Sequence, residues 1–65
     1  MKNNLRDFRE SNLMTQRDLA RKSKVSLRTI SNIERGHDCR PTTKRKLLEG
    51  MGMEFKHRLL VFPRP

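Results

Sequence analysis

The sequence predicts a small, mainly α-helical protein, a bundle of four helices followed by a C-terminal β-strand. Apolar residues recur at helical spacing through most of the chain, helix-capping residues stand before those stretches, and the spacing changes to alternation after Gly52. With 65 residues there is room for one small domain, and its core must be thin because only 32% of the residues are hydrophobic.

Each of the four predicted helices is preceded by a residue type that caps helix N-termini. Such a side chain accepts hydrogen bonds from the free N–H groups of the first turn. The helices are residues 4–12 after Asn3 or Asn4, residues 16–23 after Thr15, residues 27–35 after Ser26, and a fourth that is capped by Thr42 or Thr43 and ends near Gly50 and Gly52. Thr15 with Asp18 resembles a capping box, and Gly36 supplies a left-handed stop for the third helix.

The segment after Gly52 fits two structures. Alternation between Met53 and Val61, ended by Pro63, predicts a strand, whereas the spacing of Phe55, Leu59 and Phe62 fits a fifth helix that lacks a capping residue. The strand is the favoured interpretation. A lone strand would leave its backbone unpaired, so we expect it to pair with a second subunit through Phe55, His57, Leu59 and Val61. The chain then divides into a helical domain, residues 1–52, and a dimerisation strand and tail, residues 53–65.

Basic residues dominate the charge. The chain has 16 Lys and Arg against 7 Asp and Glu, a formal net charge of +9, and the stretch from Arg21 to Lys46 holds nine basic residues against two acids. A solvated helical face would normally intersperse acids with bases. Nucleic acid is therefore the predicted partner. An anionic membrane is disfavoured, because the basic stretch lacks the bulky apolar face of a membrane-bound helix.

Other classes of protein fit the sequence poorly. The chain has no paired carboxylates, no Ser/His/Asp set and no glycine-rich phosphate loop, and it is too short to enclose a typical substrate pocket, so we expect no enzyme. Cys39, His37 and His57 are too few for a structural zinc, and no metal or cofactor is expected. The longest apolar run is four residues and no signal-peptide segment is present, which predicts a cytoplasmic protein.

Two helices of about eight residues joined by a short turn, residues 23–25, form a helix-turn-helix pattern. The residues in and around it resemble the Xre/Cro family of helix-turn-helix repressors, which includes the phage 434 repressor. The matching residues, within 5–53, are Thr15-Gln16, Leu19-Ala20, Val25-Ser26, Thr29-Ile30-Ser31, Ile33-Glu34-Arg35-Gly36 and Arg40-Pro41. The resemblance implies a lambda-repressor-like fold and a bacterial or phage-encoded, nucleoid-associated regulator, a repressor that binds a pseudo-palindromic double-stranded DNA operator as a homodimer through residues 27–35.

The resemblance also implies roles for individual residues. Gln16 matches a glutamine that clamps a DNA phosphate, and Arg40 and Thr42 match a loop that grips the next phosphates. Base edges would be read from Ser26, Leu27, Arg28 and Asn32, with Thr29 at the backbone, and Arg17, Arg35 and Lys44 complete the predicted DNA-binding set. Arg9 and Glu34 match an ion pair that ties the first helix to the recognition helix.

The chemistry of the reading positions suits this role. Arg28 can form two hydrogen bonds to guanine, Asn32 can do the same with adenine, and Leu27 can touch only a thymine methyl group. A phosphate contact is the alternative for Arg28, because much of the hydrogen bonding between proteins and DNA goes to the backbone. The sequence departs from the family at Lys24 and Leu13, where glycine is usual, and we expect Lys24 to adopt a left-handed conformation in the short turn.

Two alternatives remain at this stage. Gly-Met-Glu-Phe followed by Leu-Leu-Val-Phe-Pro-Arg-Pro resembles the tail of HipB-type antitoxins, whose strands pair across a dimer, so the protein could be an antitoxin that binds a toxin and autoregulates its operon. An RNA-binding domain is disfavoured, because the chain has no Trp or Tyr and its three Phe are needed for the core or the tail.

Overall fold

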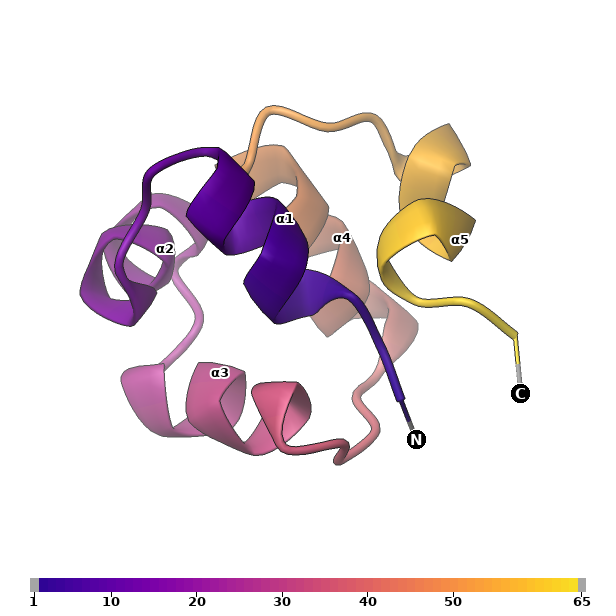
Figure 1. Cartoon of the computed structure of the whole chain (residues 1–65), viewed down its shortest axis with the longest axis horizontal. Helices are drawn as coiled ribbons and strands as arrows, with labels where there is room; N and C mark the ends of the chain where they lie inside the picture. The colour runs from indigo at the N-terminus through magenta and orange to yellow at the C-terminus, as the bar shows by residue number, and fades with distance from the viewer. Residues whose placement is uncertain (1, 65) are drawn as a thin grey trace.

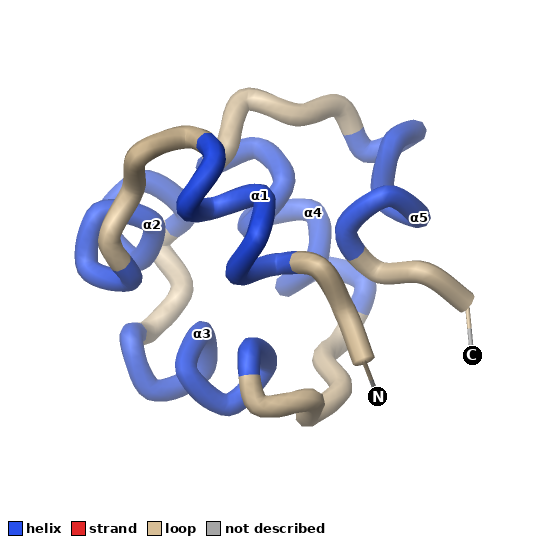
Figure 2. The backbone as a smooth tube through the Cα atoms, in the orientation of Figure 1, coloured by secondary structure: helices blue, strands red, loops and turns tan. Residues whose placement is uncertain are grey.

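Helices α1 to α4 enclose the core and α5 closes it on one side (Figure 1). The computed structural model describes residues 2–64, and these form α1 (Leu5–Ser11), α2 (Gln16–Ser23), α3 (Leu27–Glu34), α4 (Pro41–Gly50), a short 3₁₀ helix η1 (Phe55–His57) and α5 (Arg58–Val61). Within the described residues every regular element is helical (Figure 2). None of these helices is long and apolar enough to cross a membrane.

One hydrophobic core contains side chains from all five α-helices. Its buried members are Leu5, Met14, Leu19, Val25, Ile30, Ile33, Leu47, Leu48, Met51, Val61 and Phe62. A large apolar side chain contributes about 1.5–3 kcal/mol to stability when it is fully buried. The C-terminal residues Val61 and Phe62 therefore add materially to a small core that α1 to α4 would otherwise share alone.

The caps of α2 and α3 confirm the predicted helix starts. Thr15 Oγ1 accepts a hydrogen bond from Asp18 N at 3.0 Å, and Thr15 N donates to Asp18 Oδ2 at 2.9 Å, which completes the capping box. Ser26 Oγ accepts from Thr29 N at 3.1 Å. Gly36 has a φ of 106°, the left-handed stop expected after α3, although α3 itself ends at Glu34, one residue earlier than predicted.

Helix α4 begins earlier than predicted. Its N-cap is Arg40 and Pro41 is its first residue, whereas Thr42 or Thr43 was expected to cap it. Proline suits the first helical position, because its φ is already helical and the N–H that it lacks would have no partner there. As a result, Thr42 lies in the first turn rather than before it.

The predicted C-terminal strand is wrong, and the fifth-helix alternative is closer to the structure. The segment forms η1 and α5, so its backbone bonds are local: His57 N donates to Glu54 O at 3.0 Å, and Phe62 N donates to Arg58 O at 2.7 Å. A one-turn helix puts the adjacent residues Val61 and Phe62 into the core, which an alternating strand could not do. The prediction that two subunits pair through this strand is therefore wrong as well.

Two turn residues adopt the left-handed conformation that usually requires glycine. Lys24, expected to do so, has a φ of 60° between α2 and α3, and Leu13 has a φ of 57° between α1 and α2. A non-glycine residue there costs about 1–2 kcal/mol. The short turn that sets α3 against α2 is thus built as the sequence predicts, at some cost in stability.

Candidate nucleic-acid interface

Helix α3 has one buried face and one face open to solvent. Ile30 and Ile33 lie in the core, whereas Leu27 is 39% exposed and Arg28 is exposed beside it. Arg28 and Asn32 are one helical turn apart, so their side chains lie on the same side of α3. Within residues 2–64 neither side chain has a hydrogen-bond or ion-pair partner, so both can bind a ligand without breaking an internal contact.

The hydroxyl groups at the start of α3 are linked. Ser26 Oγ accepts from Thr29 N and donates to Thr29 Oγ1 at 2.7 Å. Ser26 is therefore committed to starting the helix. Thr29 Oγ1 acts as an acceptor in this pair and keeps its own proton for an external acceptor such as a phosphate oxygen.

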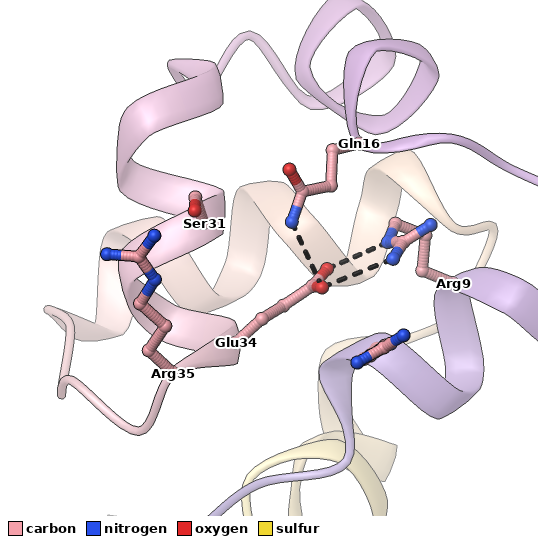
Figure 3. A pocket seen from close by; sticks show the side chains of 6 residues that line it. Arg9, Gln16, Ser31, Glu34 and Arg35 are labelled. Atoms are coloured by element: carbon pink, nitrogen blue, oxygen red, sulfur yellow. Dashed lines mark hydrogen bonds and ion pairs between the residues drawn. The ribbon is translucent and has the colours of Figure 1, made fainter.

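Arg9 and Glu34 lie side by side between α1 and α3 (Figure 3). Arg9 Nε is 2.7 Å from Glu34 Oε2, Arg9 Nη2 is 3.2 Å from Oε1, and the two side chains are 9% and 7% exposed. Arg9 Nη1 also donates to Met14 O at 2.6 Å. The hydrogen bond to Glu34 is the main cause that raises the pKa of Arg9. A buried ion pair with its hydrogen bonds made holds α1 and α3 in a fixed relation.

Glu34 holds a third residue, the predicted phosphate ligand Gln16. Gln16 Nε2 donates to Glu34 Oε1 at 3.1 Å, which uses one of the two N–H groups of the amide (Figure 3). The second N–H remains available at the N-terminal end of α2. This contact could not be predicted from the sequence, because a spacing of 18 residues reflects no local periodicity.

These residues border a polar pocket of about 340 Å³ between α1, α2 and α3. It is lined by Arg6, Arg9, Gln16, Ser31, Glu34 and Arg35. Arg9 is neutralised by Glu34, whereas Arg35 has no partner within residues 2–64 and Arg6 has only an exposed contact to Glu10, at 3.3 Å. The pocket is therefore electropositive. Sequence reasoning missed Arg6, because its spacing to Glu10 is that of an ordinary surface ion pair.

The N-terminus of α4 carries the second group of predicted phosphate ligands. Arg40 and Thr42 are both exposed, the side chain of Arg40 makes no capping bond, and the first turn of α4 contains no acid. The unpaired N–H groups of a helix N-terminus attract anions, and acids that would compete for them are missing here. Arg17, in the first turn of α2, is likewise exposed.

Lys44 lies apart from the other predicted DNA ligands. Its Nζ is 3.8 Å from Asp38 Oδ1 and 5.6 Å from the centre of the Phe62 ring, and its side chain is 23% exposed. The ammonium group is thus engaged by the loop before α4 and by the residue after α5. Cys39, in the same loop, is half-buried, and burial raises the pKa of its thiol, which disfavours a reactive thiolate.

The residues predicted for dimerisation are divided between the core and the surface. Val61 is buried, and the guanidinium groups of Arg45 and Arg58 each lie 4.8 Å from the centre of the Phe55 ring. His57 is exposed, and Leu59 and its neighbour Leu60 are 44% and 54% exposed. In α5 the two leucines leave an apolar surface open to solvent.

Comparison with known families identifies the class of protein. A family model described as helix-turn-helix matches residues 5–55, which is most of the chain. The chain belongs to this Xre/Cro-like helix-turn-helix family, and it is a DNA-binding transcription regulator. Neither the curated proteins nor the solved structures contain a match.

Proposed function

We propose that the protein is a repressor that binds a pseudo-palindromic operator as a homodimer, with α3 in the major groove. The observation that carries this proposal is the solvent-facing row on α3, where Arg28 and Asn32 have no partner within the described residues. Arg28 can donate two hydrogen bonds to the edge of a guanine. Asn32 can donate one hydrogen bond to an adenine and accept one from it. Leu27 would contact a thymine methyl group.

Phosphate contacts on both sides of α3 position it in the groove. On one side Gln16, Arg17, Arg35 and the Thr29 hydroxyl bind the backbone, and the electropositive pocket brings Arg6 to the same place. On the other side the exposed N-terminus of α4 binds the next phosphates through Arg40 and Thr42. These contacts fix the register of the protein without reading sequence, so they contribute affinity to any duplex.

Self-association through α5 would complete the operator complex. Leu59 and Leu60 are exposed next to each other, and a two-fold axis would bring the same pair from a second copy against them. A dimer with this symmetry places its recognition helices about 34 Å apart, one turn of DNA, which is why a pseudo-palindrome is expected. The antitoxin alternative gains no support here, because the tail on which it rests forms η1 and α5 instead of a strand.

Selection of binding sites from random duplex DNA tests the proposal. We expect the purified protein to enrich a two-fold symmetric motif. Arg28→Ala is expected to lose preference at one base pair in each half-site, at a cost of about 1–3 kcal/mol. Arg21→Ala is the matched control, because Arg21 is an exposed arginine held 3.3 Å from Asp18 on α2. Failure to enrich any motif contradicts specific DNA binding, and an unchanged motif with Arg28→Ala removes its base-reading role.

A further inference from the structure

Two adjacent asparagines before α1 connect α3 with α5. Asn3 Nδ2 donates to Ile33 O at 2.8 Å, near the C-terminal end of α3. Asn4 donates twice to the last residues of α5, from its backbone N to Val61 O at 2.7 Å and from Nδ2 to Leu60 O at 2.9 Å. In Figure 1 this N-terminal segment passes between the end of α3 and α5. We call residues 3–4 the strap.

The strap is itself fixed to α1. Asn3 Oδ1 accepts a hydrogen bond from Leu5 N at 3.0 Å, and Asn4 O accepts one from Phe8 N at 3.0 Å. Both asparagines are therefore part of the start of a helix, and Leu5, which follows them, is fully buried. A displacement of α5 would have to break the bonds from Asn4 or move α1.

Hydrogen bonds to the end of α5 constrain this short helix in addition to its packing. α5 comprises four residues, of which Val61 is buried, and the next residue, Phe62, is buried as well. Burial of these two adjacent side chains turns one face of α5 toward the core, but the apolar contacts themselves are not directional. A hydrogen bond is directional, and those from Asn4 reach two successive carbonyls, so they fix the rotation of the helix about its axis.

We propose that the strap makes the protein selective for one spacing between the two half-sites of the operator, because it fixes the orientation of α5 relative to α3. This inference rests on the proposed function, in which α5 carries the dimer contact and α3 reads DNA. In a two-fold dimer, the angle between those two helices within one subunit sets the distance and rotation between the two recognition helices. Asn3 and Asn4 are positioning residues in this scheme and touch no DNA.

Asn4→Asp tests the strap with little change in shape. The carboxylate cannot donate to Leu60 O, but aspartate is as good a residue as asparagine at a helix start. Asn12→Asp is the matched control: Asn12 Nδ2 also donates to a backbone carbonyl, Phe8 O at 2.7 Å, and the charge change is the same, but the bond lies within one helix and its C-cap. Both variants are compared with the unchanged protein.

The first measurement is amide hydrogen exchange in the free protein. The Phe62 amide reports on α5, because it is bonded to Arg58 O. We expect Asn4→Asp to speed its exchange about three- to tenfold relative to the core amides of α3, and Asn12→Asp to leave that ratio unchanged. An unchanged Phe62 exchange rate in Asn4→Asp contradicts the role of the Asn4 side chain in holding α5, whatever the protein binds.

The second measurement is affinity for operators whose half-sites are moved together or apart by one base pair. We expect the unchanged protein and Asn12→Asp to prefer one spacing, and Asn4→Asp to lose about three- to tenfold of that preference while keeping its affinity for a single half-site. If Asn4→Asp speeds exchange at Phe62 but keeps the preference for one spacing, the strap has no role in selecting the spacing. A monomer on the full operator contradicts the proposed dimer and the spacing role together, and the exchange result then still decides whether the strap holds α5.

Discussion

Lys24 and Leu13 have strained backbone conformations, and both side chains are exposed, so neither offsets the strain by burial. Both have a left-handed φ, and Leu13 is 93% exposed, so it buries almost no apolar surface in return. Glycine relieves a cost of about 1–2 kcal/mol at such a position, although it adds about 0.5–1 kcal/mol of unfolded-state entropy.

We therefore predict that Lys24→Gly leaves the free energy of unfolding unchanged or raises it by up to about 1 kcal/mol. The measurement is urea denaturation followed by circular dichroism. Lys22→Gly is the control, since Lys22 lies inside α2, where glycine costs about 1 kcal/mol. A clear loss of stability in Lys24→Gly means that the lysine side chain makes a stabilising contribution that outweighs the strain of its backbone.

Asp18 makes the capping box sensitive to pH. The hydrogen bond from Thr15 N is the main cause that lowers the pKa of this carboxyl, followed by the bond with the Thr15 side chain. A lowered pKa in the folded state means that the ionised form stabilises the fold. That contribution is present above the unfolded-state value of about 3.9 and disappears as the pH falls through the folded-state pKa.

We predict that Asp18→Asn is less stable than the unchanged protein at pH 7 and that the difference shrinks below about pH 4. Thermal unfolding at several pH values measures it. Asp7→Asn, at an exposed acid in the first turn of α1, is the control for the loss of one negative charge. A difference between Asp18→Asn and the unchanged protein that stays constant from pH 7 to pH 3 is inconsistent with the ionised carboxylate as its source.

Local residue chemistry was predictable from the sequence where the partners are close in the chain. The Thr15–Asp18 box and the left-handed Lys24 depend on three or four neighbouring residues, and both were predicted. The pairing of Arg9 with Glu34 was predicted only through the family resemblance, because a separation of 25 residues does not itself predict a contact. The third member, Gln16, could not be anticipated, because its contact depends on how α2 is packed against α3.

At the scale of elements, α2 and α4 approach each other through small residues. A Cβ atom added at Gly50 would lie 2.9 Å from Ser23 Cβ and 3.1 Å from the backbone of the same residue. Ser23 cannot move aside easily, because it is buried and its Oγ donates to Leu19 O at 2.6 Å. The glycine is needed for the close approach of the two helices.

We predict that Gly50→Ala destabilises the protein by about 1–3 kcal/mol, even though alanine is the better helix former. Chemical denaturation measures the change. Glu49→Ala, one residue earlier on α4 and exposed, is expected to change stability by less than about 0.5 kcal/mol. If Gly50→Ala proves as stable as the unchanged protein, α4 can shift away from α2 without loss, and the contact does not limit the packing.

The elements that the sequence predicted correctly are those with their own start and stop signals. α2 and α3 have a capping residue before them and a left-handed residue near their ends, so local chemistry defines them. α5 has neither: its N-cap position, His57, makes no side-chain capping bond. Its conformation depends on the burial of Val61 and Phe62 and on Asn4, which is 56 residues away from the carbonyl of Leu60 that it binds. Alternation over a short segment could not reveal such distant contacts.

At the scale of the whole molecule, charge is the property that a DNA complex depends on most. The net charge of +9 resides on a small chain whose Cα radius of gyration is 10.2 Å, only slightly more than the Debye length of about 8 Å at physiological salt. Each phosphate that a cation neutralises releases condensed counterions, so the logarithm of the binding constant falls by about 0.9 per phosphate contact against the logarithm of salt concentration.

We predict a steep salt dependence of binding to duplex DNA, and a slope smaller by about 0.9 for Arg40→Ala, because the exposed Arg40 precedes the open N-terminus of α4. Arg40→Ala is expected to weaken operator and unrelated duplexes alike, whereas Arg28→Ala is expected to weaken the operator selectively. Fluorescence anisotropy with both duplexes at several salt concentrations separates these effects. Arg21→Ala removes the same charge at a residue paired with Asp18 and is expected to keep the full slope. A slope near zero for the unchanged protein counts against DNA as the partner, and an undiminished slope in Arg40→Ala removes this arginine from the phosphate contacts.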